Sequence, residues 1–232
     1  MRKKKLPALI CFNRCGILRK KKLPAQLQRI LSLLQRKKAL TAIVLIKEDA
    51  KMEQQAQEAE VLAVESIGYG SRVCVDLIDQ LDPTEGVLVG NTGYGYLQVL
   101  SENRITETYP ARPFRINCGA IHQYLNIGEN KTTYLAEIRP GQAIPVLKDG
   151  EVRKVSIGRV KIEKRKFLRI VCKVNEVEIS ACLQESNSVH LLGADGEAKS
   201  VIDLKKGDRV VCYLDQPGRH LGEKIEEEIS EF

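Results

Sequence analysis

The sequence predicts an α+β chain that is mainly β. An N-terminal helix-strand-helix remnant of an α/β region is expected to precede an antiparallel, β-rich and barrel-like region. After Gly68 the chain consists of short β-branched runs separated by Gly, Pro and Asn, without a convincing helical pattern. A turn glycine opens an alternating strand three times, at Gly70, Gly141 and Gly207. These patterns are typical of a curled antiparallel sheet or a small barrel.

A basic leader begins the chain. The segment RKKKLPA at residues 2–8 recurs at residues 19–25, and no acidic residue precedes Glu48. Thirteen Lys and Arg lie in the first 40 positions, which leaves 24 bases and 30 acids, a net charge of −6, in residues 41–232. The total of +7 therefore describes the leader and does not indicate a nucleic-acid-binding body. A flexible basic arm, a targeting peptide and a segment translated from a wrong start all stay open.

Helical spacing of apolar residues predicts a first helix that follows Pro24 and ends near Lys38. A strand at 40–46 and a second, more polar helix over 49–65 complete the expected remnant. Two Asp-Gly pairs, at 149–150 and 195–196, are strong hairpin signals in the β-rich part. The expected divisions are a leader at 1–40, an α/β remnant at 41–67 and a β-rich domain at 68–232.

Seven cysteines occur without any CxxC pair, and most lie among aliphatic residues. Such thiols act as small core residues, so we expect a reduced protein in a reducing compartment such as the cytoplasm, with no metal site. No apolar run reaches the roughly 18 residues of a membrane-spanning helix, so a soluble protein is expected. Hydrolase and nucleotide-binding signatures such as G-x-S-x-G and the Walker loop are absent, and aromatic platforms for nucleic-acid bases are few.

A glycine-rich segment, residues 86–96, is either a hairpin with a glycine-rich tip or a loop that approaches a phosphate closely. Farther on, Arg112 and Arg115 flank a proline and an aromatic residue, and His122 follows seven positions later. These residue types suit an anionic substrate with a proton to move, although surface charges and a core imidazole would give the same pattern. Alternation over 158–163 places Arg159, Lys161 and Glu163 on one face, usually a solvated one.

At these segments the sequence resembles the archaeal-type, or type II, 3-dehydroquinate synthase family. The order and spacing of the matching blocks hold from about residue 60 to the C-terminus, while the first 40 or so residues match nothing. The blocks are Arg72–Asp76, Glu85–Gly90, Ala111–Asn117 with Gly119 and His122, Lys131–Leu135, Gly158–Glu163, Asp203–Asp208 and Gly218–Glu226.

The resemblance implies an NAD-dependent oxidoreductase that oxidatively deaminates and cyclises an amino-dideoxy-heptulosonate to 3-dehydroquinate, for aromatic amino-acid synthesis. It implies a small anionic substrate as partner and no membrane, and it argues against nucleic acid without excluding it, while homo-oligomer formation stays open. The candidate catalytic residues are His122, His220, Lys131, Lys161 and Glu163. The candidate substrate-binding residues are Arg112, Arg115, Asn117 and Arg219, and the candidate cofactor-binding residues are Gly90, Gly93 and Gly95.

Members of that family are longer and carry an N-terminal α/β region of which this chain keeps a short part. Two other interpretations therefore stay open. One is a catalytically inactive fragment, or a module of the same fold that binds a metabolite or cofactor. The other is a β-barrel that binds RNA through its basic arm.

Overall fold

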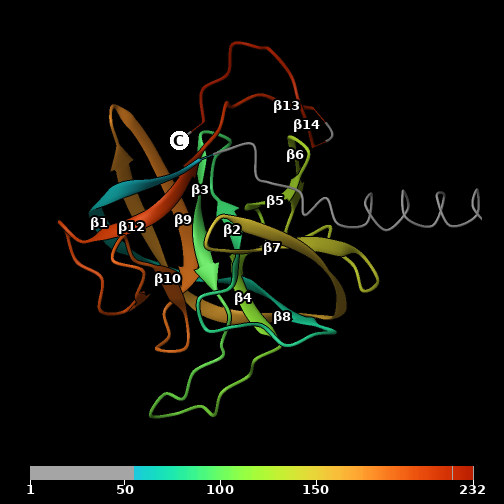
Figure 1. The fold of residues 1–232 in the computed structure, drawn as a ribbon. Coiled ribbons are helices and arrows are strands. Elements are labelled where there is room, and N and C mark those ends of the chain that lie inside the picture. Colours follow the sequence, from blue (N-terminus) through green and yellow to red (C-terminus); the bar gives the residue numbers. More distant parts are fainter. Residues whose placement is uncertain (1–54, 221, 232) are drawn as a thin grey trace, which may run out of the picture. The chain divides into compact units, whose positions relative to one another are not determined.

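The computed structural model describes residues 55–220 and 222–231, and in them the chain forms strands but no helix (Figure 1). None of this part could therefore cross a membrane as a helix. The strands are β1 (Ala56–Leu77), β2 (Gly86–Gly90), β3 (Gly95–Leu100), β4 (Arg115–Ala120), β5 (Tyr124–Gly128), β6 (Lys131–Tyr134), β7 (Ala143–Lys148), β8 (Glu151–Val174), β9 (Val177–Gln184), β10 (His190–Leu192), β11 (Ala198–Ser200), β12 (Arg209–Leu214), β13 (Arg219–His220) and β14 (Glu223–Lys224).

The described strands belong to one antiparallel sheet, which confirms the β-rich prediction. Its hydrogen-bonded path runs β11-β10-β3-β12-β1-β8-β7-β2-β5-β6-β14-β13, with β4 paired to β1 and β9 paired to β8 off this path. The path ends at β11 and β13, and an additional pairing joins β2 to β3 within it. The pairings of β3, β12, β1, β8, β7 and β2 therefore form a ring, while a barrel as such stays a prediction.

The longest ladder joins β1 to β8 and positions most of the other strands. β1 pairs with β8 from Glu60 to Leu77. The other edge of β1 pairs with β12 near its start and with β4 near its end. Since side chains alternate across a strand, one face of β1 points toward the core and the opposite face can carry polar and charged side chains.

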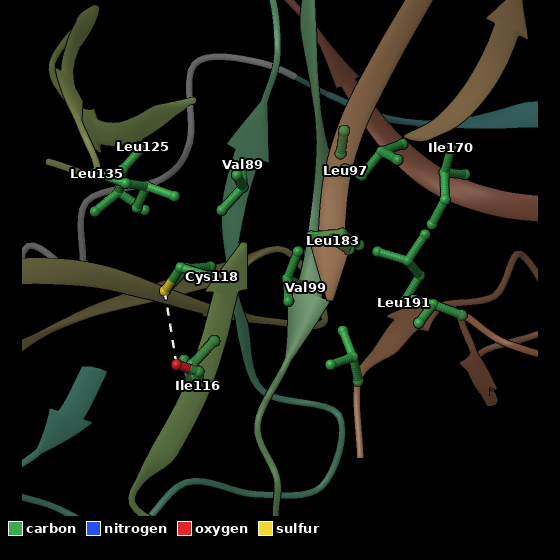
Figure 2. Packing of buried hydrophobic residues seen from close by; sticks show 14 of the residues in the cluster. Val89, Leu97, Val99, Ile116, Cys118, Leu125, Leu135, Ile170, Leu183 and Leu191 are labelled. Carbon is green, nitrogen blue, oxygen red and sulfur yellow. Dashed lines mark hydrogen bonds between the residues drawn. The ribbon is translucent and has the colours of Figure 1, made fainter. Parts of the chain in front are cut away.

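The core is a layer of aliphatic side chains between these strands. Figure 2 shows residues from β2, β3, β4 and β9 pointing toward one another, among them Val89, Leu97, Ile116 and Leu183, all fully buried. Cys118 lies in the same layer, where its thiol donates to the carbonyl of Ile116 at 3.7 Å. The five cysteines in the described part are free and buried, which confirms the prediction of core thiols for Cys74, Cys118, Cys172, Cys182 and Cys212.

The sequence correctly predicted the short turn at Asp149 and Gly150. Asp149 and Gly150 form the two-residue turn between β7 and β8, and both have positive φ (51° and 81°), as a type I′ turn requires. Residues 86–96 form the predicted hairpin of β2 and β3. The interpretation of Gly70 as a turn glycine was wrong, because it lies inside β1. A Cβ there would be 3.1 Å from the ring of Phe167, so the glycine makes room for that ring.

The predicted second helix was wrong for residues 56–65, which form the first part of β1. Their Ala, Glu and Gln content favours a helix locally. The burial alternates instead, with Glu58 and Glu60 exposed and Ala59 and Val61 buried. Pairing with both β12 and β8 stabilises this extended form beyond the local preference. The predicted first helix, the strand at 40–46 and the basic leader lie outside the described residues.

We expect Gly119→Ala to lower the free energy of unfolding of the domain more than Gly150→Ala, the same change at a turn. Both Gly119 and Gly150 have positive φ, but a Cβ at Gly119 would lie 2.5 Å from the backbone oxygen of Cys182, whereas nothing lies within 4 Å at Gly150. Gly150→Ala should therefore cost about 1 kcal/mol and Gly119→Ala about 3 kcal/mol. Urea unfolding measures both, and equal costs would show that the close approach is absent.

Candidate functional site

The candidate site is a cavity of about 150 Å³ on one face of β8, β1 and β4, here called the arginine cavity. Most of its lining is polar or charged, and basic side chains outnumber acidic ones. The lining residues are Arg72, Glu102, Tyr109, Arg112, Arg115, Asn117, Lys161, Glu163, Arg165, Gln184, Ser186 and Ser188.

Strand register builds the floor of the arginine cavity, which we define as the shared face of β8, β1 and β4. In β1 the buried Val73 and Val75 belong to the core, so the alternating residues between and beside them point to the opposite face. The neighbouring strands continue this face in rows. The rows are Glu163, Arg72 and Ala120; Lys161, Cys74 and Asn117; and Arg159, Asp76 and Arg115.

Two irregular segments form the sides of the cavity. One is the loop between β3 and β4, residues 101–114, which projects at the bottom of Figure 1 and carries Arg112. Its base is fixed because Arg112 N–H donates to the backbone oxygen of Glu102 at 2.8 Å. The other segment follows β9 and includes Ser186 and Ser188. Thr108 of the loop donates to Asn187 of this segment at 3.1 Å, so the two sides touch.

Asp76 holds two arginines at one end of the floor. Arg115 donates to it from Nε at 2.7 Å and from Nη2 at 3.1 Å, and Arg159 donates from Nε at 2.7 Å. Burial raises the pKa of Asp76, but hydrogen bonds and charge from both arginines lower it more, so the pKa is below its ordinary value. The ionised carboxylate fixes the Arg115 guanidinium beside the cavity.

Glu163 holds basic side chains at the other end of the floor, as Asp76 does at its end. It accepts from Arg72 at 2.5 Å and Arg165 at 3.0 Å, and Lys161 lies 3.5 Å away. Burial raises its pKa, whereas the three cations together lower it below the ordinary value. Glu163 is therefore an ionised hub that positions cations, and its low basicity does not suit a proton acceptor.

The lining of the arginine cavity carries an excess of positive charge. Five of its side chains are cationic and only Glu102 and Glu163 are anionic. Arg112 and Lys161 have the longest ion pairs among these cations, to Glu102 at 3.4 Å and to Glu163 at 3.5 Å. The guanidinium of Arg112 lies over the ring of Tyr109, 5.1 Å from the centroid. A small anion, above all a carboxylate, is the ligand that such a lining stabilises.

The structure brings together five of the residues that the sequence predicted, namely Arg112, Arg115, Asn117, Lys161 and Glu163. It adds residues that sequence reasoning missed as site residues, chiefly Arg72, Arg165 and Gln184. For Arg72 a signal existed, since a polar residue alternates with valines in Arg72–Asp76. Nothing local marks Gln184, which reaches Asn117 from a strand 67 positions away.

His122 does not line the arginine cavity. Its Nε2 lies 2.6 Å from Oδ1 of Asn91, so it contacts the loop between β2 and β3 instead. Partial burial lowers the pKa of His122, which favours the neutral ring at neutral pH. His220 and Lys131 lie elsewhere again, where β13, β14 and β6 meet, and Lys131 pairs there with Glu223 at 3.0 Å.

The predicted cofactor glycines form a tight hairpin end. A Cβ at Gly90 would lie 2.3 Å from the oxygen of Gly95, so the backbones approach closely. The N–H of Gly93 already donates to the carboxylate of Glu231 at 2.6 Å. Asn91 N–H donates to Ser180 at 2.8 Å. With these donors engaged by the protein, this loop does not form a pyrophosphate cradle by itself. The side chain of Arg219 lies outside the described part.

Comparison with known proteins identifies the domain. A family model described as the 3-dehydroquinate synthase II C-terminal domain matches residues 58–232. The chain belongs to this family. It is 44% identical over 172 residues to a protein named 3-dehydroquinate synthase from Methanocella arvoryzae, which covers 74% of this chain and 46% of that relative. The resemblance read from the sequence motifs is thereby confirmed.

Two more relatives extend the comparison. A 3-dehydroquinate synthase from Archaeoglobus fulgidus is 41% identical over 174 residues, covering 75% of this chain and 54% of the relative. A 3-dehydroquinate synthase homolog from Persephonella marina is 40% identical over 174 residues, covering 75% and 53%. The chain therefore spans about half the length of the curated relatives it matches. All lining residues of the arginine cavity fall within the region matched to the 3-dehydroquinate synthase II C-terminal domain.

In this 3-dehydroquinate synthase II domain, Asp76→Asn should reduce stability at pH 7 by about 3 kcal/mol, because Arg115, whose side chain is 13% exposed, loses its counter-charge. The folded-state pKa of Asp76 lies below the unfolded value of about 3.9, so its contribution is present above about pH 4 and is lost as the pH falls further. Urea unfolding measured from pH 7 to pH 3 should show that the difference in free energy of unfolding between wild type and Asp76→Asn becomes smaller as the pH falls. A difference independent of pH would contradict this assignment.

The control for this series is Glu176→Gln, which removes a carboxylate whose side chain is 94% exposed. We expect its stability to follow that of the wild type at every pH, because exposed ion pairs contribute little.

Proposed function

We propose that this chain supplies the substrate-anchoring part of an NAD-dependent 3-dehydroquinate synthase. The proposed reaction is the oxidative deamination and cyclisation of 2-amino-3,7-dideoxy-D-threo-hept-6-ulosonate to 3-dehydroquinate, in aromatic amino-acid biosynthesis. The observation that carries the proposal is the convergence of five cationic side chains on a cavity of about 150 Å³. Family membership and the names of the relatives support the reaction.

Arg112 and Arg115 are the proposed anchors of the substrate carboxylate. Arg115 is held by Asp76, so its direction is fixed before the ligand arrives. Arg112 lies over Tyr109 and pairs with Glu102 through one contact at 3.4 Å, longer than those between Arg115 and Asp76, so it is the proposed adaptable anchor. A fixed and an adaptable guanidinium together favour an anion at the side of the cavity where β4 begins.

Lys161 is the proposed stabiliser of negative charge during ring closure. The aldol step develops an enolate, and a nearby ammonium group lowers the free energy of such a transition state. Lys161 lies in the middle row of the cavity floor and is half-buried. Glu163 keeps the ammonium group beside the cavity, at 3.5 Å.

Oxidation of the amine-bearing carbon requires a hydride acceptor, and NAD is the acceptor that we propose. The glycine hairpin at residues 90–95 does not fit the pyrophosphate as the structure has it, since Gly93 N–H is engaged by Glu231. We therefore derive no step through the cofactor. His122 is the proposed proton carrier at this hairpin, because its pKa is lowered and the neutral ring can accept a proton.

We expect Arg112→Ala to weaken binding of the heptulosonate amine about 10- to 100-fold, because a charge-assisted contact to the carboxylate is lost. Isothermal titration of the full chain measures the affinity, and NADH formation measures turnover. The matched control is Arg209→Ala, which removes an arginine that is 67% exposed and pairs with Glu58 outside the cavity. Unchanged affinity in Arg112→Ala would show that Arg112 does not anchor the substrate carboxylate. A wild-type chain that neither binds nor turns over the amine would overturn the proposal.

Binding without turnover would favour the second candidate, a substrate-binding module. The observation in its favour is that the chain spans about half the length of its relatives. Groups that act as a unit lose most of their rate enhancement when part of the unit is missing.

A further inference from the structure

A polar cluster of His122, Asn91 and Cys182 lies outside the arginine cavity. Oδ1 of Asn91 is 2.6 Å from Nε2 of His122 and 3.8 Å from Sγ of Cys182. The three residues come from three separate elements, namely the turn after β4, the loop between β2 and β3, and β9. None of them lines the arginine cavity, so the cluster is a separate feature of the domain.

A buried framework fixes the positions of these residues. The backbone N–H of Asn91 donates to the oxygen of Ser180 on β9 at 2.8 Å. Gln123 is fully buried, donates from Nε2 to the backbone oxygen of Cys182 at 2.9 Å, and accepts from the backbone N–H of Cys182 at 2.6 Å. Because Gln123 directly follows His122, these bonds tie the turn that carries the imidazole to the strand that carries the thiol. The cluster is therefore built into the fold.

The thiol of Cys182 favours one orientation of the Asn91 amide. Burial raises the pKa of Cys182, so the thiol keeps its proton at neutral pH and donates to Oδ1. The opposite orientation would direct the amide N–H groups at a neutral sulfur, which is a weak acceptor. Since Oδ1 accepts hydrogen bonds and has none to donate, Nε2 of His122 supplies the proton in the 2.6 Å contact.

The other ring nitrogen, Nδ1, is then the basic atom of the neutral imidazole. His122 is exposed to solvent, and among the described residues the contact with Asn91 is its one hydrogen bond. Nδ1 is therefore available to a bound molecule. The titratable neighbour of this pair is the Cys182 thiol, on which the charge of Arg169 acts. An amide supports Nε2–H without the negative charge that would favour the imidazolium, so it leaves the ring neutral at neutral pH.

We infer that Asn91 is a positioning residue that holds the proton of neutral His122 on Nε2, so that Nδ1 is the atom that takes up a proton. The proton passes from the donor to the lone pair of Nδ1, the donor keeps the bonding electron pair, and the imidazolium formed still donates from Nε2 to Asn91. The inference rests on the proposed function of His122 as proton carrier. It adds the atom that accepts the proton and the residue that selects this atom.

The first test is a long-range ¹H–¹⁵N NMR titration of the full wild-type chain, which reports the protonation of each imidazole nitrogen. The sequence has three histidines, so His190→Gln and His220→Gln assign the signals. We expect neutral His122 to carry its proton on Nε2 and to titrate at Nδ1. A neutral form with the proton on Nδ1 would overturn the inference.

Two substitutions of Asn91 should move the pKa of His122 in opposite directions. Asn91→Asp places a carboxylate beside Nε2–H and should raise the pKa by at least about 1. Asn91→Leu removes an acceptor that stabilises the imidazolium more than the neutral ring, and should lower the pKa. A merely structural role would loosen the ring in both variants, and the relief of burial would raise the pKa in both. A rise in both variants, or no change in either of them, would overturn the inference.

The matched control is Asn175→Asp, which adds the same charge at an exposed position in the turn between β8 and β9. This turn lies seven positions before Cys182, about 20 Å along the strand, where the charge is screened. The pKa of His122 should keep its wild-type value in this control. If Asn91→Leu fails to fold, Asn91→Asp, which is nearly equal in size to the wild-type residue, and the wild-type protonation state still decide the inference.

The outcomes separate this inference from the proposed function, because the NMR measurements require no turnover. Opposite pKa changes in a chain that forms no NADH would retain the positioning by Asn91 and reject the proposed reaction. NADH formation without the expected protonation state or pKa changes would retain the proposed function and reject the role of Asn91. If the chain turns over, the acidic limb of the kcat profile should move to higher pH in Asn91→Asp, because the neutral ring is then reached at higher pH.

Discussion

The register of β1 against β8 and β4 decides which side chains meet in the arginine cavity. Because side chains alternate with a period of two, a shift by one residue would send Val73 and Val75 to the cavity and Arg72 to the core. The cost of burying unpaired charges among aliphatic residues excludes that alternative. The hydrophobic core therefore fixes the geometry of the charged face, even though none of its members touches the cavity.

Electrostatic compensation is the second requirement of this arrangement. Five cations around a small space repel one another, and burial makes the repulsion stronger. Asp76 and Glu163 offset it at opposite ends of the floor, each holding more than one basic side chain. The acids neutralise only part of the charge, so the cavity keeps the positive potential that suits an anion. Their low pKa values keep this compensation in place at neutral pH.

Much of the fold was readable from the sequence, because short β-branched runs and tight Asp-Gly turns are local signals. The helix expected over 49–65 failed at residues 56–65 because pairing with distant strands outweighed the local preference of Ala and Glu. At the site, Arg112 and Arg115 were found since they are close in sequence. The contact of Gln184 with Asn117 depends on how β9 approaches β4, which no local pattern encodes. Proximity in sequence also suggested His122 for the same site, whereas its position after β4 turns it toward Asn91.

Local charge and net charge carry different information in this chain. Residues 41–232 have a net charge of −6, which by itself would argue against an anionic ligand. The strand register nevertheless gathers basic side chains from β1, β4, β8 and the loop before β4 into one cavity whose lining is positive. Interactions beyond about 8–10 Å are screened at physiological ionic strength, so an anion inside the cavity responds chiefly to this lining. The net charge of residues 41–232 and the charge of the cavity lining therefore bear on different properties, and only the lining bears on a ligand of this cavity.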